Sequence, residues 1–253
     1  MLNSSGIHIN SLNYLIIIVG VGGTGGNFAK ELCRLVSNFP KNKDIKIVFM
    51  DGDTVELKNK SRQPFVNLDI TRNKANILAE RCSTTFDIDI IENTFFLTQK
   101  EQLLDIIHNY QDYLPIIIGC VDNHRARQIM HDVFNRINNC IYLDSANESW
   151  YGEVVCGLRG NGETILQPRA YFFPEVLTDS KIGKDEESCE VRIDKAPQHL
   201  VTNLQAAVIL LSFISDILIR EKVTCNMVTF DISKKFVKAA DLDFSNIGEN
   251  KNV

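Results

Sequence analysis

The stretch NYLIIIVGVGGTGGNFAKEL, residues 13–32, decides the fold. Residues 14–19 are apolar and mostly β-branched, which favours a strand buried on both faces of a sheet. The glycine-rich turn GVGGTG follows at residues 20–25, and residues 27–36 have the composition of a helix. A glycine-rich turn between a strand and a helix predicts a phosphate site, because unpaired N–H groups of the helix start can hold an anion. The expected nucleotide-binding glycines are Gly20, Gly22, Gly23 and Gly25.

The second stretch, IKIVFMDGDTVELKNKSRQPF at residues 45–65, begins with another apolar run and reaches Asp51. A carboxylate at the end of this strand can accept hydrogen bonds from ribose hydroxyls. NAD-dependent dehydrogenases and ATP-using adenylating enzymes share this feature. Asp51 therefore predicts a nucleotide without identifying it.

The remainder of residues 1–146 alternates predicted strands with predicted helices, which indicates a parallel sheet covered on both faces. The further strands are expected at 88–93, 115–120 and 140–144, and the helices at 71–84, 99–110 and 125–136. After Ala146 we expect a hairpin over 151–165, a loop over 178–195, a helix over 197–220 and antiparallel strands over 226–242. The predicted class is α/β, with a mostly parallel Rossmann-like sheet extended by antiparallel strands.

Composition excludes several functional classes. The chain has 253 residues, a net charge of −5 and no basic block, which disfavours a nucleic-acid partner. Its longest apolar run, near residues 206–219, is interrupted by Ser212, Ser215 and Asp216, so a buried helix is expected and no membrane partner. Seven cysteines without a C-x-x-C pair favour neither a disulfide framework nor a zinc site. We expect a cytoplasmic protein.

Polar residues beyond Asp51 separate the two nucleotide hypotheses, because a dehydrogenase has no use for them. They follow strands whose carboxyl ends converge on one crevice of a parallel sheet, so they are expected to face one bound nucleotide. They are Asp53, Asn59, Arg62, Gln63, Lys74, Asp122, Asn123 and Arg127.

At this point the sequence resembles the ubiquitin-activating-enzyme-like superfamily, whose bacterial members include the ThiF and MoeB proteins. The family pattern appears in order as GVGGTG, DGDTVELKNKSRQ, DITRNK and CVDN. Thr71 is the one departure in the third motif, where a glycine is usual. The resemblance implies one adenylation domain over residues 1–253, with a nucleotide-binding part at about 14–146 and an acceptor-binding part at about 147–245.

The resemblance also implies a reaction and a set of roles. ATP adenylates the C-terminal carboxylate of a small ubiquitin-like or sulfur-carrier protein that ends in glycine. The implied assignments are Asp51 to ribose, Arg62 and Lys74 to phosphates, and Asp122 to magnesium. Asp53, Asn59, Gln63 and Asn123 are expected around the nucleotide. Gln63 and Asn59 can orient oxygens without adding charge, and Asp53 is expected to support Asp51 or the metal. A homodimer is expected by the same resemblance.

Cys189 lies in a charged segment before the long predicted helix, where many relatives carry a thiol that accepts the activated carboxylate. Lys195 and Arg192 favour a thiolate there, whereas Glu190 opposes it. An ordinary loop thiol therefore remains the alternative.

The alternatives for the whole protein are an inactive partner subunit, an enzyme that activates a small-molecule or tRNA carboxylate, and an NAD-dependent dehydrogenase. Residues 1–13 contain no arginine or lysine, although some relatives supply an N-terminal arginine to the partner's ATP.

Overall fold

The computed structural model describes residues 6–39, 43–178, 199–240 and 242. Its main sheet has nine strands, and five of them are parallel in the order β6-β5-β2-β3-β4. Their bounds are β2 Asn13–Val19, β3 Asp44–Met50, β4 Ile90–Asn93, β5 Leu114–Gly119 and β6 Cys140–Asn147. The predicted fold class is confirmed, and β2 lies at the centre of this parallel part.

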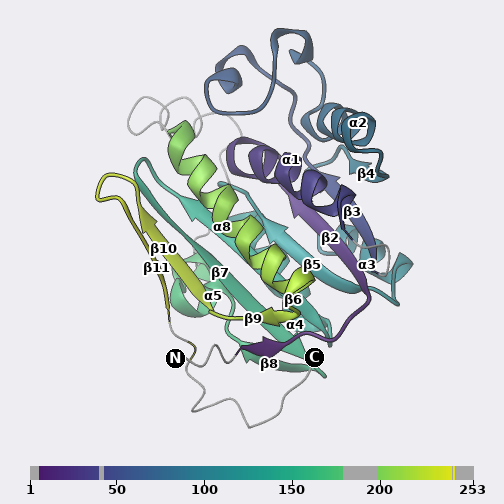
Figure 1. The fold of residues 1–253 in the computed structure, drawn as a ribbon, viewed down its shortest axis with the longest axis vertical. Coiled ribbons are helices and arrows are strands. Elements are labelled where there is room, and N and C mark those ends of the chain that lie inside the picture. Colours follow the sequence, from purple (N-terminus) through teal and green to yellow (C-terminus); the bar gives the residue numbers. More distant parts are fainter. Residues whose placement is uncertain (1–5, 40–42, 179–198, 241, 243–253) are drawn as a thin grey trace.

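Antiparallel strands extend the sheet beyond β6 (Figure 1). β7 (Tyr151–Gly160) pairs with β6, with β8 (Glu163–Leu166) and with β10 (Met227–Asp231), and β11 (Phe236–Ala239) forms the edge. The expected β7–β8 hairpin turns at Asn161 and Gly162, whose φ angles of 52° and 80° suit a tight turn between antiparallel strands.

Two layers of helices cover the sheet because its central strands are apolar on both faces. Along β2, Ile16 and Ile18 join the core cluster that includes α1, α2 and α8, whereas Ile17 and Val19 join the cluster with α3 and α4. Figure 1 shows α1 and α8 side by side over one face. The helix bounds are α1 Gly23–Ser37, α2 Lys74–Phe86, α3 Glu101–Asn109, α4 His124–Arg136 and α8 Leu200–Ile219.

α8 is, among the described residues, one helix long and apolar enough to cross a membrane by length and composition alone. However, 56% of its most apolar window is buried within the fold. It packs along α1, and Ala206, Leu210 and Ile214 are almost inaccessible to solvent. α8 therefore has the burial of a core helix.

Several elements were not predicted from the sequence. β1 (Ile7–His8) and β9 (Lys222–Val223) form a separate two-stranded sheet. Two short 3₁₀ helices, η1 (Leu57–Ser61) and η2 (Asn67–Asp69), lie between β3 and α2. Two further four-residue helices are α5 (Arg169–Phe172) and α6 (Glu175–Thr178). Such short elements carry too few residues for a periodic pattern to appear.

The helix predicted over residues 71–84 begins three residues late, at Lys74. Thr71 has a φ of 74°, which is incompatible with a right-handed helix. Asn73 then caps α2, because its side chain accepts a hydrogen bond from the Asn76 N–H at 3.0 Å.

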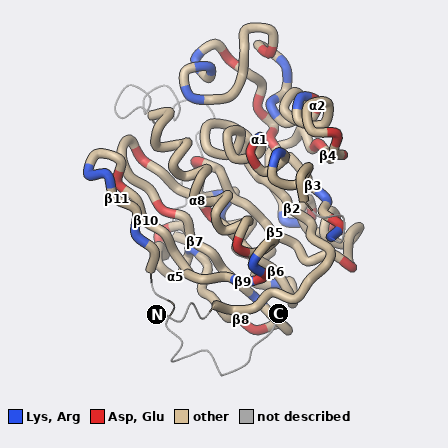
Figure 2. The backbone as a smooth tube through the Cα atoms, viewed as in Figure 1, with Lys and Arg blue, Asp and Glu red and all other residues tan. Residues whose placement is uncertain are grey.

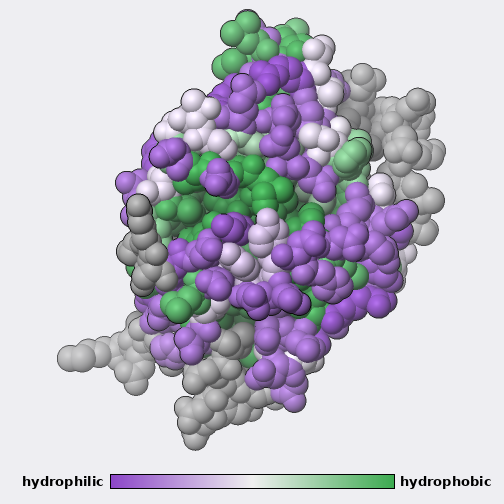
Figure 3. Space-filling model, turned by 90° about the vertical axis from the view of Figure 1, so that its right-hand side faces the viewer, coloured by the Kyte–Doolittle hydropathy of each residue, from purple (hydrophilic) through white to green (hydrophobic). Residues whose placement is uncertain are grey.

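Charged residues of both signs are interspersed along the described chain (Figure 2). On the face shown in Figure 3, hydrophobic residues gather in a hollow that hydrophilic residues surround. Leu57 and Leu68, in the segment between β3 and α2, are 68% and 88% exposed.

Candidate active site

The glycine turn lies where the order of the parallel strands reverses, since β2 has β3 on one side and β5 on the other. Ligands of open α/β sheets bind at such a position. Gly20 has a φ of 86°, and a Cβ at Gly25 would lie 1.9 Å from the Gly20 carbonyl oxygen. The turn therefore needs glycine, and it leads into the N-terminus of α1, where Gly22 offers no side-chain cap.

Asp51 fastens the end of β3 to this turn. Its Oδ2 accepts a hydrogen bond from the Val21 N–H at 2.8 Å, and its Oδ1 accepts one from the Asp53 N–H at 2.9 Å. Burial raises the pKa of Asp51 above its ordinary value, against the lowering effect of the Lys74 charge and of both N–H donors. Each carboxylate oxygen can accept a further hydrogen bond, so the group remains able to bind a hydroxyl.

Lys74 lies beside Asp51 and Asp53 at the start of α2. Its side chain is 7% exposed, and its Nζ lies 2.8 Å from Asp53 Oδ2. The Lys74 N–H also donates to the Asp53 carbonyl oxygen at 2.9 Å. The structure therefore brings two carboxylates and one buried ammonium group together next to the glycine turn.

Gln63 and Arg62 approach the turn from the segment after η1. The Gln63 Nε2 lies 3.5 Å from the position that a Cβ at Gly22 would take. Its Oε1 is buried and has no hydrogen-bond partner among the described residues. Arg62 is half-buried, and its carbonyl oxygen accepts a hydrogen bond from Asn27 Nδ2 of α1 at 3.4 Å.

Asn59 and Asn123 both cap helices in this structure. Asn59 is buried, and its Oδ1 accepts a hydrogen bond from the Glu56 N–H at 2.8 Å at the start of η1. The Asn123 Oδ1 accepts one from the Ala126 N–H at 2.8 Å at the start of α4. Asp122, next to it, is exposed just beyond the carboxyl end of β5.

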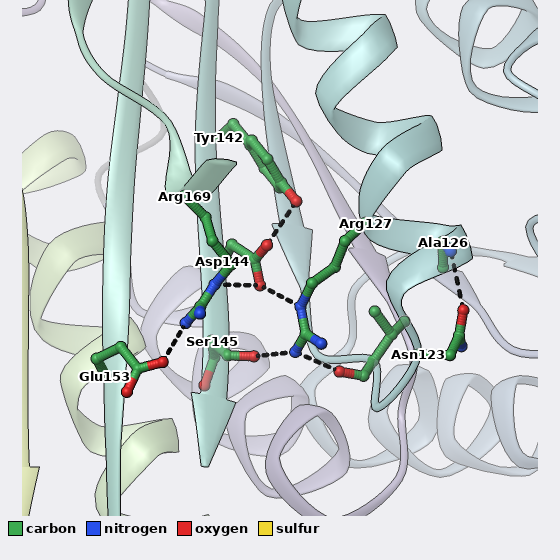
Figure 4. Close-up of polar contacts among 9 residues, drawn as sticks. Asn123, Ala126, Arg127, Tyr142, Asp144, Ser145, Glu153 and Arg169 are labelled. Atoms are coloured by element: carbon green, nitrogen blue, oxygen red, sulfur yellow. Dashed lines mark hydrogen bonds and ion pairs between the residues drawn. The ribbon is translucent and has the colours of Figure 1, made fainter. Parts of the chain in front are cut away.

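Arg127, expected near the nucleotide, points into the fold instead (Figure 4). Its Nε lies 3.1 Å from Asp144 Oδ1, and its Nη2 donates to the carbonyl oxygens of Val121 at 2.6 Å and Ser145 at 3.1 Å. Burial disfavours its charge, but the neighbouring Asp144 carboxylate outweighs this and raises the pKa of Arg127. Arg127 thus joins the carboxyl ends of β5 and β6 and fixes the backbone before Asp122.

Asp144 is the centre of a buried network that sequence reasoning missed. The Tyr142 hydroxyl donates to Asp144 Oδ2 at 2.7 Å, and Arg169 Nε lies 3.4 Å from Asp144 Oδ1. Arg169 also pairs with Glu153 at 2.7 Å (Figure 4). Burial, followed by the Asp144 charge, raises the pKa of Tyr142 well above its ordinary value. The only sequence signal was a carboxylate ending an apolar strand.

A second missed group is the polar trio of Thr24, Asn147 and Asn203, in which Thr24 and Asn203 are buried and Asn147 is half-buried. Thr24 Oγ1 donates to Asn147 Oδ1 at 3.0 Å, and Asn147 Nδ2 donates to Asn203 Oδ1 at 2.9 Å. These residues come from the start of α1, the end of β6 and the first turn of α8. Thr24 belongs to the glycine turn itself, and Asn203 Nδ2 lies 2.3 Å from the position that a Cβ at Gly23 would take.

Cys189 lies outside the described residues, as does most of the predicted loop at 178–195. Within the described ranges, no group of three or more His, Cys, Asp or Glu side chains could hold a metal ion by itself. Magnesium beside a nucleotide is bound through one or two carboxylates together with phosphate oxygens, so a single exposed carboxylate such as Asp122 is compatible with the predicted site.

Comparisons with known proteins agree on the family and the fold. The model of the ThiF family matches residues 10–247. E. coli MccB solved with AMPCPP and MccA has a TM-score of 0.65 at 14% identity, covering 92% of this chain and 65% of that one. E. coli MccB with ATP gives 0.64 at 13% identity, covering 91% and 64%. PaaA gives 0.62 at 16% identity, covering 90% and 64%.

The chain thus spans about two thirds of the length of these structural neighbours, 64–65%. A search of curated proteins returned no significant match.

Proposed function

The chain belongs to the ThiF family, and from this premise we propose that it uses ATP to adenylate a carboxylate. The proposed acceptor is the C-terminal carboxylate of a small ubiquitin-like or sulfur-carrier protein ending in glycine. E. coli MccB, which shares the fold, has been solved with ATP and with MccA, and this supports a nucleotide site combined with an acceptor site.

One observation carries the proposal: Asp51, Asp53 and Lys74 meet beside a glycine turn at the switch point of the sheet. A dinucleotide site needs the turn and Asp51 but has no evident use for a buried lysine at this place. A triphosphate does, because a lysine ammonium group neutralises phosphate charge as a compact point charge. ATP binding would draw Lys74 away from Asp53, or leave it bridging Asp53 and a phosphate.

The reaction needs no general base. A carboxylate oxygen of the acceptor forms a bond to the α-phosphorus of ATP, and the bond from that phosphorus to the oxygen bridging to the β-phosphorus breaks. Pyrophosphate leaves with that electron pair, and the product is an acyl-adenylate. Catalysis then depends on positioning the reactants in line and neutralising the charge that develops on the phosphates.

The residues of this chain divide these tasks. Asp51 holds the ribose, the N–H groups of the glycine turn hold the phosphates, and Lys74 and Arg62 neutralise charge. Asp122 would hold magnesium, which supplies further neutralisation of phosphate oxygens when bound. The Arg127–Asp144 pair holds the Val121 carbonyl group, and so positions the neighbouring Asp122 without contacting the reactants.

The test is ATP–pyrophosphate exchange, measured with radiolabelled pyrophosphate and purified candidate acceptors that end in Gly-Gly. We expect exchange that depends on one acceptor, and a loss of at least about 100-fold for Lys74→Ala, about 2.7 kcal/mol of transition-state stabilisation. Lys30→Ala is the matched control, because Lys30 is exposed on α1 and should leave exchange unchanged. Bound ATP without exchange for any acceptor would remove the proposal.

A further inference from the structure

Asn203 is a buried amide with one unused end. No part of the residue is exposed, and its Nδ2 has no hydrogen-bond partner among the described residues. Its Oδ1 faces the other way, where Asn147 Nδ2 lies at 2.9 Å and Thr24 Oγ1 at 3.4 Å. With Asn147 Nδ2 donating to Oδ1, the unpaired Nδ2 is the end that points away from the trio.

This unpaired donor lies directly against the glycine turn. A Cβ built at Gly23 would come within 2.3 Å of Asn203 Nδ2, so the amide occupies the space that any side chain at position 23 would need. Gly23 is partly exposed and is the first residue of α1. A ligand oxygen that reaches Gly23 would therefore come within range of Nδ2.

The position also favours an anion. α1 and α8 pack along each other, and the contact of Thr24 with Asn203 joins their first turns, so two helix N-termini lie together. Each N-terminus carries a partial positive charge. A buried donor without an acceptor costs about 1–3 kcal/mol, which is a reason to expect an acceptor in the working complex.

The position of Asn203 relative to β3 indicates which part of the reactants it would contact. Asp51 and Lys74 belong to the β3 side, where the ribose and the outer phosphates are assigned. Asn203 accepts a hydrogen bond from Asn147 at the end of β6. In the sheet, β5 and then β6 follow β2 on the side opposite to β3. A carboxylate that attacks the α-phosphorus opposite the leaving pyrophosphate would approach from the side away from the outer phosphates.

We propose that Asn203 Nδ2 donates a hydrogen bond to the carboxylate oxygen that does not attack the phosphorus and becomes the carbonyl oxygen of the acyl-adenylate. Asn203 then contacts the acceptor's chain end rather than the nucleotide. This assignment rests on the proposed adenylation. It gives α8 a direct part in acceptor recognition.

Two nucleosides, one with and one without a glycyl group on the sulfamate nitrogen, provide the test. One is 5′-O-(N-glycylsulfamoyl)adenosine, which resembles an acyl-adenylate, and the other is 5′-O-sulfamoyladenosine, which lacks the acyl group. Their dissociation constants are measured by calorimetry for the wild type, Asn203→Asp, Asn203→Ser and the exposed control Asn135→Ala. Asn203→Asp should fold, because Asn147 Nδ2 can still donate to it and the two helix N-termini favour its charge.

We expect Asn203→Asp to bind the glycyl compound at least about ten-fold more weakly, and Asn203→Ser about five-fold more weakly, since Ser removes the amide donor without adding charge. Sulfamoyladenosine should change less than two-fold. An equal loss for both compounds would make Asn203 a nucleotide contact, and no loss for either would make it purely structural; both results overturn the assignment. If the wild type binds neither compound, the proposed function fails and the assignment with it.

Discussion

Thr71 should be a source of strain that a single substitution relieves. It has a φ of 74°, in the left-handed region that a β-branched residue rarely adopts, and it stands where the family motif usually has glycine. Its side chain is exposed, and its N–H donates to the Val55 carbonyl oxygen at 2.9 Å. Thr71→Gly keeps this backbone hydrogen bond and removes only the branched Cβ.

The expected gain follows from two opposing contributions. The left-handed conformation costs an L-residue about 1–2 kcal/mol. Glycine gives the unfolded chain more freedom, which lowers stability by about 0.5–1 kcal/mol. The net expectation is that Thr71→Gly raises the free energy of unfolding by about 0.5–1 kcal/mol, or Tm by about 1–4 °C for a domain of this size.

Urea denaturation followed by circular dichroism measures the change, with thermal melting as a second assay. Thr85→Gly is the matched control, because Thr85 is exposed inside α2, where glycine should lower stability by about 0.3–0.5 kcal/mol. If Thr71→Gly destabilises the protein as Thr85→Gly does, the strain argument is refuted.

Three further predictions concern the buried polar groups. Arg127→Met leaves the Asp144 carboxylate without its nearest guanidinium, and urea denaturation should show a loss of about 3 kcal/mol in the free energy of unfolding; a loss below about 1 kcal/mol contradicts this. Gly23→Ala places a methyl group 2.3 Å from Asn203 Nδ2 and should lower stability by about 1–3 kcal/mol, most of it recovered when Asn203→Ala is added; no recovery would show that the two do not meet. For Asp69, burial opposes ionisation, but a guanidinium and a backbone N–H outweigh it and hold the pKa below its ordinary value of 3.8. The stabilising effect of the Asp69 carboxylate is therefore present above that pH and lost as pH falls through the folded-state pKa. The difference in free energy of unfolding between wild type and Asp69→Asn should shrink between about pH 5 and pH 2. A difference that does not change with pH would contradict this prediction.

The sequence predicted those elements whose residues follow one another along the chain. The apolar run of β2, the glycine turn and the start of α1 follow one another along the chain, so strand, turn and helix are all determined within about 25 residues. Asp51 and Lys74 lie beside the turn in the structure, because the carboxyl ends of adjacent parallel strands share one edge, and their roles toward a nucleotide stay predictions.

Contacts between distant segments were not predictable in the same way. Arg127 is an arginine in the helix that follows β5, as expected of a nucleotide ligand. Its guanidinium instead pairs with Asp144 inside the fold, because the end of β6 lies beside the end of β5. The sequence alone does not show that the Asp144 carboxylate is the one that lies beside the Arg127 guanidinium.

The chain by itself determined the α/β class, the glycine turn and the order of the motifs, since each depends on hydrogen bonding and periodicity within short segments. Only the tertiary structure placed Asn203 against Gly23, because α8 reaches the first turn of α1 by packing on the same face of the sheet. The packing of distant helices depends on how side chains fit across the interface, and no local pattern encodes that fit.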